Sequence, residues 1–146
     1  MSIYNKRKEE QKMKKQIEVV AGVIKHNGEY LCMERDQGKY DYVSYKFEFP
    51  GGKIEEGETH EQTLVRELQE EMEFEVEIEK PYMVTTHEYP DFIVTMNVFL
   101  CNAKSREFVL NVHKSFEWLP LEKLNTLDWA AADIPVVDKL LNDFAN

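Results

Sequence analysis

The stretch that decides the fold is GKIEEGETHEQTLVRELQEEMEF, residues 52–74. Thr59 and Gln62 have the spacing of a capping box, in which each side chain bonds the backbone N–H of the other residue at the start of a helix. The stretch predicts a helix that begins after Thr59 and buries one side against the core. Its apolar positions recur at helical spacing, at Leu64, Val65, Leu68 and Met72.

Three carboxylates lie on another face of this helix. Glu67, Glu70 and Glu71 are spaced i, i+3 and i+4, so their side chains are neighbours and repel one another. Two interpretations follow from the spacing alone. The glutamates form a solvated acidic face, or they bind a divalent cation such as Mg²⁺, which prefers hard oxygen ligands.

The residues around the glutamates resemble the Nudix box, G-x5-E-x7-R-E-U-x-E-E-x-G-U, where U is apolar. Gly52, Glu58, Arg66 and the three glutamates fall at its specified positions, and the chain departs from it at Glu73, where the pattern has glycine. Glycine there would end the helix in a left-handed conformation, so the departure concerns the helix end. The resemblance extends over residues 14–144 and is to the MutT branch, nucleoside triphosphate pyrophosphohydrolases. The supporting stretches are 20–24, 48–55, 89–91 and 127–135.

The resemblance implies an α+β fold, an α/β/α sandwich around a mixed sheet. It also implies that Mg²⁺, or Mn²⁺, binds to Glu67, Glu70 and Glu71 and to a backbone carbonyl of Gly51 or Gly52. One of the glutamates, Glu67 or a neighbour, would orient or deprotonate the attacking water. Arg66 is counted among the catalytic residues with the three glutamates. It would anchor their cluster by pairing with Glu58.

Four further residues are implied in substrate binding. Arg35 and Lys53 would contact phosphate oxygens, although each is equally well explained as ordinary surface charge. Asp133 matches a base-contacting position of the family, and it also suits the N-cap of the last helix because Pro135 follows closely. Phe92 is also predicted to contact the substrate.

One metal ligand of the family is absent. Many members carry a further glutamate six residues before the tryptophan that corresponds to Trp118, and this chain has Val112 there, followed by His113. Glu117 or Glu48 could substitute. The number of metal ions bound stays open.

Composition narrows the class of protein. The chain has 146 residues and a net charge of −10, which argues against binding to nucleic acid polymers or anionic membranes through a positive field. Residues 1–15 run against this trend with six Lys or Arg and two Glu, and are interpreted as a basic, disordered or helical N-terminal extension before a single domain, residues 16–146. No signal region or long apolar run is present, so we expect a cytoplasmic protein, monomeric or homodimeric. Cys32 and Cys101 are expected to be reduced core residues.

Periodicity predicts the remaining elements. Strands are expected at 16–25, 30–34, 74–78, 82–88, 93–101 and 115–119, with a helical turn at 120–124 and a last helix at 134–144. Asn27-Gly28 predicts a tight hairpin turn. Tyr40, Tyr42 and Tyr45 either line a base pocket or pack within their loop.

The resemblance, together with the three glutamates on one face of the helix, implies a Mg²⁺-dependent hydrolase that cuts (deoxy)nucleoside triphosphates to the monophosphate and pyrophosphate. Asp133, if ionised, only accepts hydrogen bonds and so favours CTP, dCTP or modified pyrimidine nucleotides, whose cytosine amine donates. The alternatives are an 8-oxo-dGTP diphosphatase and, in another class, a nucleotide-binding sensor without turnover.

Overall fold

A computed structural model describes residues 14–145. The prediction for residues 1–15 therefore lies outside the described residues, except at its end, where Lys15 is already the first residue of a strand. None of the helices in the described chain is long and apolar enough to cross a membrane.

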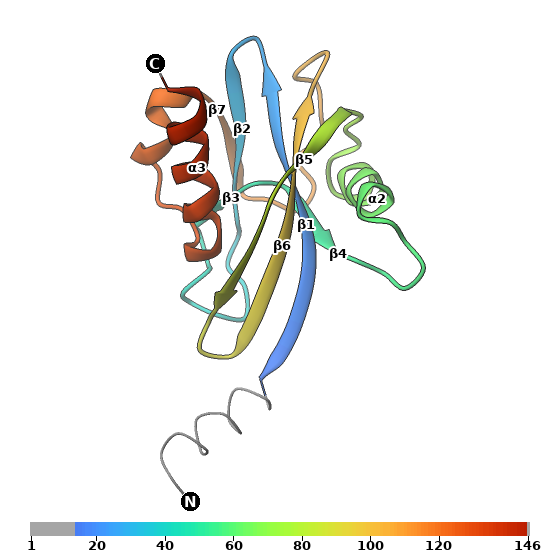
Figure 1. Ribbon diagram of the computed structural model, residues 1–146, viewed down its shortest axis with the longest axis vertical. Helices are drawn as coiled ribbons and strands as arrows, with labels where there is room; N and C mark the ends of the chain where they lie inside the picture. Colours follow the sequence, from blue (N-terminus) through green and yellow to red (C-terminus); the bar gives the residue numbers. More distant parts are fainter. Residues whose placement is uncertain (1–13, 146) are drawn as a thin grey trace, which may run out of the picture.

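A mixed sheet forms the centre of the molecule (Figure 1). Its path is β3-β2-β1-β6-β5, with β4 paired to β1 and β7 paired to β2. β1 and β6 are parallel, and the other pairs are antiparallel. The strands are β1 (Lys15–His26), β2 (Glu29–Glu34), β3 (Phe47–Glu48), β4 (Gly51–Lys53), β5 (Glu77–Glu88), β6 (Phe92–Asn102) and β7 (Ser115–Pro120).

One edge of β1 is shared between two partners, and this positions the site. β1 pairs with β2 only next to the hairpin turn, at Lys25 and His26. Further toward its N-terminus β1 pairs with β4 instead, through Val19, Val20 and Ala21. The glycine-rich strand β4 is thereby placed in the middle of the sheet, between the core strand and the helix that follows it.

Helices cover both faces of the sheet, as the α/β/α prediction requires (Figure 1). α2 (His60–Met72) packs on one face, where it buries Leu64, Leu68 and Met72. The 3₁₀ turns η1 (Leu121–Thr126) and η2 (Ala131–Asp133) and the helix α3 (Ile134–Phe144) cover the other face. Each face of the sheet has its own apolar core, and successive side chains of β1 pack alternately into the two. Val20 packs into the core under α2 and Ala21 into the core under α3.

Most predicted elements are confirmed, including the hairpin turn, where Asn27 and Gly28 both have positive φ. The separate strands predicted at 74–78 and 82–88 are wrong, because the chain forms one strand, β5, from residue 77. β5 keeps its pairing with β6 through two register irregularities on either side of Pro81. A proline is tolerated there because β5 lies at the edge of the sheet.

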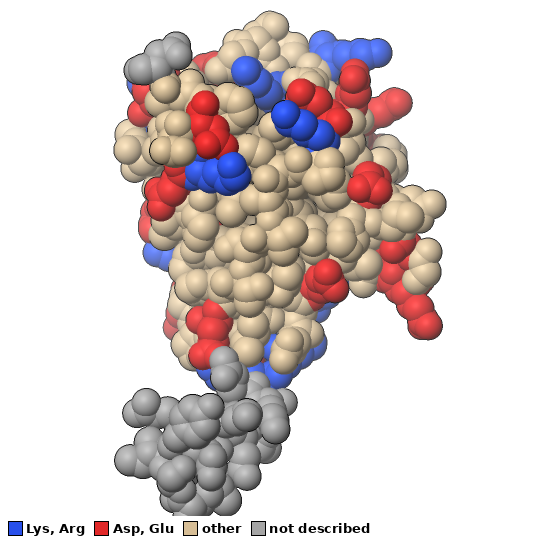
Figure 2. Space-filling model, viewed as in Figure 1, with Lys and Arg blue, Asp and Glu red and all other residues tan. Residues whose placement is uncertain are grey.

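Charged side chains lie around the margin of the face shown in Figure 2. On the face shown in Figure 2, acidic and basic side chains surround a mostly uncharged central area over β5 and β6. Both cysteines are buried and free, as predicted, and burial raises the pKa of each thiol to about 12.

Candidate active site

The helix of the box begins and ends at the residues the sequence indicates. Thr59 Oγ1 accepts from the backbone N–H of Gln62, and the Gln62 side chain accepts from the N–H of Thr59. At the other end Glu73 takes the left-handed conformation, φ 47° and ψ 44°, in place of the family's glycine. The N–H of Phe74 closes this end on the carbonyl of Leu68. The departure from the box therefore leaves the helix boundary intact.

Two glycines bring β4 against its neighbours at distances that no side chain permits. A Cβ on Gly51 would lie 1.9 Å from the backbone oxygen of Val20. A Cβ on Gly52 would lie 2.3–2.7 Å from the carboxylate atoms of Glu67. The carboxylate of Glu67 thus lies directly against the backbone of β4 at Gly52.

Arg66 organises the acidic residues around it, as the resemblance implies. Its Nε and Nη2 donate to the two oxygens of Glu58 at 2.7 and 2.9 Å, and this pairing lowers the pKa of Glu58 to about 2. Nη1 donates to Glu67 at 3.0 Å and to Glu70 at 3.1 Å. Nη2 also bonds the carbonyl of Lys53. Arg66 therefore ties α2 to the loop before it and to β4.

The three glutamates of the box are not equivalent. Glu71 and Glu67 are close enough for a side-chain hydrogen bond, and burial together with the charges of Glu67 and Glu48 raises the pKa of Glu71 to about 8. Glu70 instead turns to Arg66 and is more exposed. Accordingly, within residues 14–145 no set of three or more acidic, His or Cys side chains is already arranged to hold a metal ion.

The pair of Glu67 and Glu71 nevertheless suits a hard divalent cation. Two carboxyl groups in contact can share a proton or share a cation, and carboxylate oxygens are ligands that Mg²⁺ prefers. Glu70 can join the pair only by leaving Arg66. The ligand set of three glutamates and a backbone carbonyl of Gly51 or Gly52 stays a prediction.

Metal binding should release a proton from this pair. With its pKa raised to about 8, Glu71 is mostly protonated at pH 7 without metal, and a ligating carboxylate must be ionised. We expect release of about one proton per Mg²⁺ at pH 7 and almost none above pH 9. Titration calorimetry in buffers of different ionisation enthalpy measures this number directly. The same binding enthalpy in every buffer at pH 7 would contradict it.

A cleft of about 620 Å³ opens beside the box helix. This volume falls in the range of small-molecule sites. Arg66, Glu67 and Glu70 are not among the residues that line the cleft. The other site residues predicted from the sequence all line it, namely Arg35, Gly51, Gly52, Lys53, Glu71, Phe92 and Asp133.

Asp133 is buried in the wall of this cleft, with 4% of its surface exposed. Asp133 is the N-cap residue of α3, as predicted, but within the described chain its side chain caps no N–H of the helix, because η2 continues into α3 and leaves Asp133 itself helical. Its Oδ1 accepts instead from the N–H of Phe49 at 3.1 Å. Burial, and then the charge of Glu48, raise its pKa well above the ordinary value. This shift runs against the premise that Asp133 is ionised.

Glu48 is a residue whose importance sequence reasoning saw only in part. Arg35 Nη1 donates to Glu48 Oε1 at 3.1 Å, and His113 Nε2 lies 2.8 Å from Glu48 Oε2. The negative charge of Glu48 is felt by both Glu71 and Asp133. Glu117, the other substitute considered, is exposed and does not line the cleft. The link to His113 spans 65 residues, and no local sequence signal could have shown it.

An aromatic cluster borders the cleft at the end of the β5–β6 hairpin. Tyr40 stacks on Tyr42, and Tyr42 stacks on Tyr89, with ring centroids 5.3 and 5.2 Å apart. Phe92 contacts all three. Tyr40 packs in the cluster, as one interpretation of the tyrosine loop holds, and it also lines the cleft. The role of the loop in a base pocket stays a prediction. Tyr45 is exposed and lies under the ammonium of Lys114.

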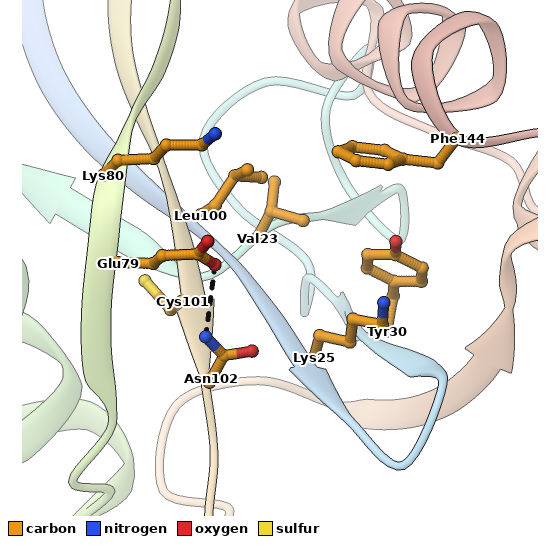
Figure 3. A pocket seen from close by; sticks show the side chains of 9 residues that line it. All are labelled: Val23, Lys25, Tyr30, Glu79, Lys80, Leu100, Cys101, Asn102 and Phe144. Atoms are coloured by element: carbon orange, nitrogen blue, oxygen red, sulfur yellow. Dashed lines mark hydrogen bonds between the residues drawn. The ribbon is translucent and has the colours of Figure 1, made fainter.

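A second, smaller pocket of about 190 Å³ opens at the other end of β1 (Figure 3). Lys25 and Lys80 reach toward it from the rim, and Phe144 of α3 closes one side. It contains none of the site residues predicted from the sequence.

Comparison with known proteins decides the family. The NUDIX domain profile matches residues 15–140. The chain belongs to the Nudix family. It is 33% identical to the 8-oxo-dGTP diphosphatase of Escherichia coli K12, over 86% of this chain and 97% of that protein. It is 29% identical to the CTP pyrophosphohydrolase of the same organism, over 87% and 93% of the two chains.

Solved structures agree with this assignment. The MutT protein of Staphylococcus aureus 252 is 37% identical, with a TM-score of 0.70, over 90% of this chain and 99% of that one. The MutT protein of Methanosarcina mazei Go1 is 22% identical and has a TM-score of 0.80 over 92% and 99%, which shows the shared fold. The protein is thus a Nudix hydrolase of the nucleotide pyrophosphohydrolase type, and Nudix hydrolases generally use divalent cations.

Proposed function

We propose that this Nudix hydrolase cleaves nucleoside triphosphates to a monophosphate and pyrophosphate, with Mg²⁺ as the cation and Mn²⁺ as a substitute. The observation that carries the proposal is the composition of one cleft. Glu71 and the β4 glycines lie in its wall, Arg35 offers a guanidinium for phosphate, and Asp133 and Phe92 offer a polar and an apolar contact for a base. A triphosphate with its nucleoside needs these three kinds of group in one place.

The chain's own residues divide the work. Glu67 and Glu71 would hold the cation, which supplies charge neutralisation at phosphate and a more acidic water. Glu67, which is held between Arg66 and β4, or a neighbouring carboxylate of the box would orient or deprotonate the attacking water. Arg66 acts by position, because its donors are directed to Glu58, Glu67 and Glu70. Arg35 and Lys53, which both line the cleft, would bind the phosphates.

The buried Asp133 changes which base fits. Oδ1 accepts from the N–H of Phe49, and burial raises the pKa of the carboxyl group, so a neutral Asp133 would donate a hydrogen bond through its other oxygen. The O6 of a guanine-type base accepts one, whereas the cytosine amine only donates. We therefore put 8-oxo-dGTP first and keep CTP and dCTP, which an ionised Asp133 would favour, as the second candidate. Both candidate substrates are kept because the chain is similar to an 8-oxo-dGTP diphosphatase and to a CTP pyrophosphohydrolase.

Replacing Asp133 with Asn tests whether the carboxyl group is neutral. Its folded pKa lies above the unfolded value of about 3.9, so above that pH the unfolded chain has lost a proton that the folded chain keeps, and stability falls as pH rises. Asn keeps an acceptor for Phe49 and does not titrate. The difference in Tm between Asp133→Asn and the wild type should move in favour of the variant from pH 5 to pH 8. A constant difference would show that Asp133 is ionised throughout.

A panel of 8-oxo-dGTP, dGTP, CTP, dCTP and 5-substituted pyrimidine triphosphates tests the proposed substrate. Release of pyrophosphate with Mg²⁺ is measured with a coupled pyrophosphatase. We expect 8-oxo-dGTP to give the highest kcat/KM. A preference for CTP or dCTP would support the second candidate, and binding without turnover of any of them would identify a sensor.

A further inference from the structure

His113 stands apart from the rest of its loop. The loop that joins β6 to β7 exposes Val109, Leu110 and Val112, whereas the His113 side chain is only 4% exposed. The next residue is fixed as well, because the N–H of Lys114 bonds the carbonyl of Glu34. Burying an imidazole from an exposed loop is unfavourable unless a polar group meets it, so its partner accounts for its position.

That partner is Glu48, and both of its oxygens are engaged. Arg35 Nη1 donates to Oε1, and His113 Nε2 lies 2.8 Å from Oε2. A carboxylate only accepts, so Nε2 carries the proton. Nδ1 is buried and has no hydrogen-bond partner among residues 14–145. The imidazole therefore makes its one polar contact with Glu48.

The contact with His113 restrains the side chain of Glu48. Glu48 shares the cleft with Glu71 and Asp133, and its charge acts on both. Without a donor on Oε2, Glu48 would be free to turn away from Glu71, and the guanidinium bonded to its other oxygen would turn with it. His113 thus fixes a rotamer that neither Glu48 nor Arg35 would keep alone.

We propose that His113 is a positioning residue for the triphosphate, which acts through Glu48 to hold Arg35 in the orientation that binds phosphate. This inference rests on the proposed function, because it takes Arg35 to be a phosphate ligand. It assigns no chemistry to the imidazole itself. It makes the β6–β7 loop a part of substrate binding although the loop is more than 60 residues away from Arg35 in sequence.

A matched pair of variants separates the contact from the packing. His113→Leu fills much of the volume and removes the donor, while His113→Gln returns an N–H donor at a similar reach. We expect Leu to raise KM, and the Kd of a non-hydrolysable triphosphate analogue, by about 5- to 20-fold with kcat changed less than about threefold, and Gln to restore most of the loss. His60→Gln, at an exposed imidazole outside the cleft, is the control and should leave both constants unchanged.

A double-mutant cycle with Arg35→Gln decides the route of the effect. If His113 acts through Arg35, His113→Leu should have almost no further effect on Kd once Arg35 is replaced. Additive losses, a fall in kcat instead of a rise in KM, or a Gln variant as weak as Leu would each overturn the inference. Should the Leu variant fail to fold, His113→Asn, whose amide is too short to reach Glu48, takes its place.

Binding of the non-hydrolysable analogue to the wild-type protein distinguishes a failure of the role proposed for His113 from a failure of the proposed function. No binding by the wild type would overturn the proposed function together with this role. Binding by the wild type with an additive cycle would overturn this role alone. Ring ¹⁵N chemical shifts give a readout without substrate, since the wild type should show the proton of His113 on Nε2.

Discussion

Replacing Glu71 with Gln should lower triphosphate turnover by roughly 10²- to 10³-fold, the loss usual for one electrostatic group at a reacting centre. Gln keeps the shape of the side chain and removes the charge that a cation needs. The fold should not suffer, because burial and the charges of Glu67 and Glu48 already disfavour the ionised form of Glu71. We expect the Tm without metal to equal or exceed that of the wild type.

The measurement is kcat with Mg²⁺ beside the Tm of the same preparations. Glu61→Gln is the matched control: it removes a carboxylate from the first turn of the same helix, outside the cleft, and should keep kcat within about twofold. Normal turnover by Glu71→Gln would rule out the metal site on this face of α2. A loss of turnover that is accompanied by unfolding would mean that Glu71 is structural.

Replacing Gly52 with Ala should mainly lower turnover, whereas replacing Gly51 with Ala should mainly lower the free energy of unfolding. At Gly52 the new Cβ would meet the carboxylate of Glu67, which can move, so we expect a folded protein with turnover lowered by about 10²-fold or more. At Gly51 the Cβ would meet the backbone oxygen of Val20, which is fixed in β1, so we expect a loss of about 1–3 kcal/mol in unfolding free energy.

Urea denaturation and kcat measured on both variants test this contrast. Gly57→Ala is an informative control for stability, because Gly57 has a positive φ and open space around it. It should cost some stability through its backbone conformation and leave kcat unchanged. If Gly52→Ala kept full activity, the close contact between β4 and Glu67 would have no role in catalysis.

The local part of the fold could be predicted because its signals are local. The capping box at Thr59 and the apolar stripe of α2 lie within one helix, and the Asn27-Gly28 turn needs two residues. The spacing that matched the Nudix box identified the carboxylates for the same reason. Even Glu73 followed the pattern, since the cost of a left-handed glutamate is small compared with the packing around it.

The non-local part could not be predicted in this way. β4 replaces β2 as the partner of β1 halfway along the sheet, and no pattern within either strand shows this. Asp133 has the sequence context of a helix cap, yet its side chain turns to Phe49, 84 residues away. The pairing of Arg66 with Glu70 likewise depends on where Glu58 and Glu67 lie, and it separates Glu70 from Glu71.

The identity of the products tests the central claim most directly. Phosphorus NMR of a reaction with 8-oxo-dGTP and Mg²⁺ should show pyrophosphate and the nucleoside monophosphate appearing together in equal amounts, and chelation of the metal with EDTA should stop both. Orthophosphate with a nucleoside diphosphate as the first products, or the same rate in EDTA, would contradict the account.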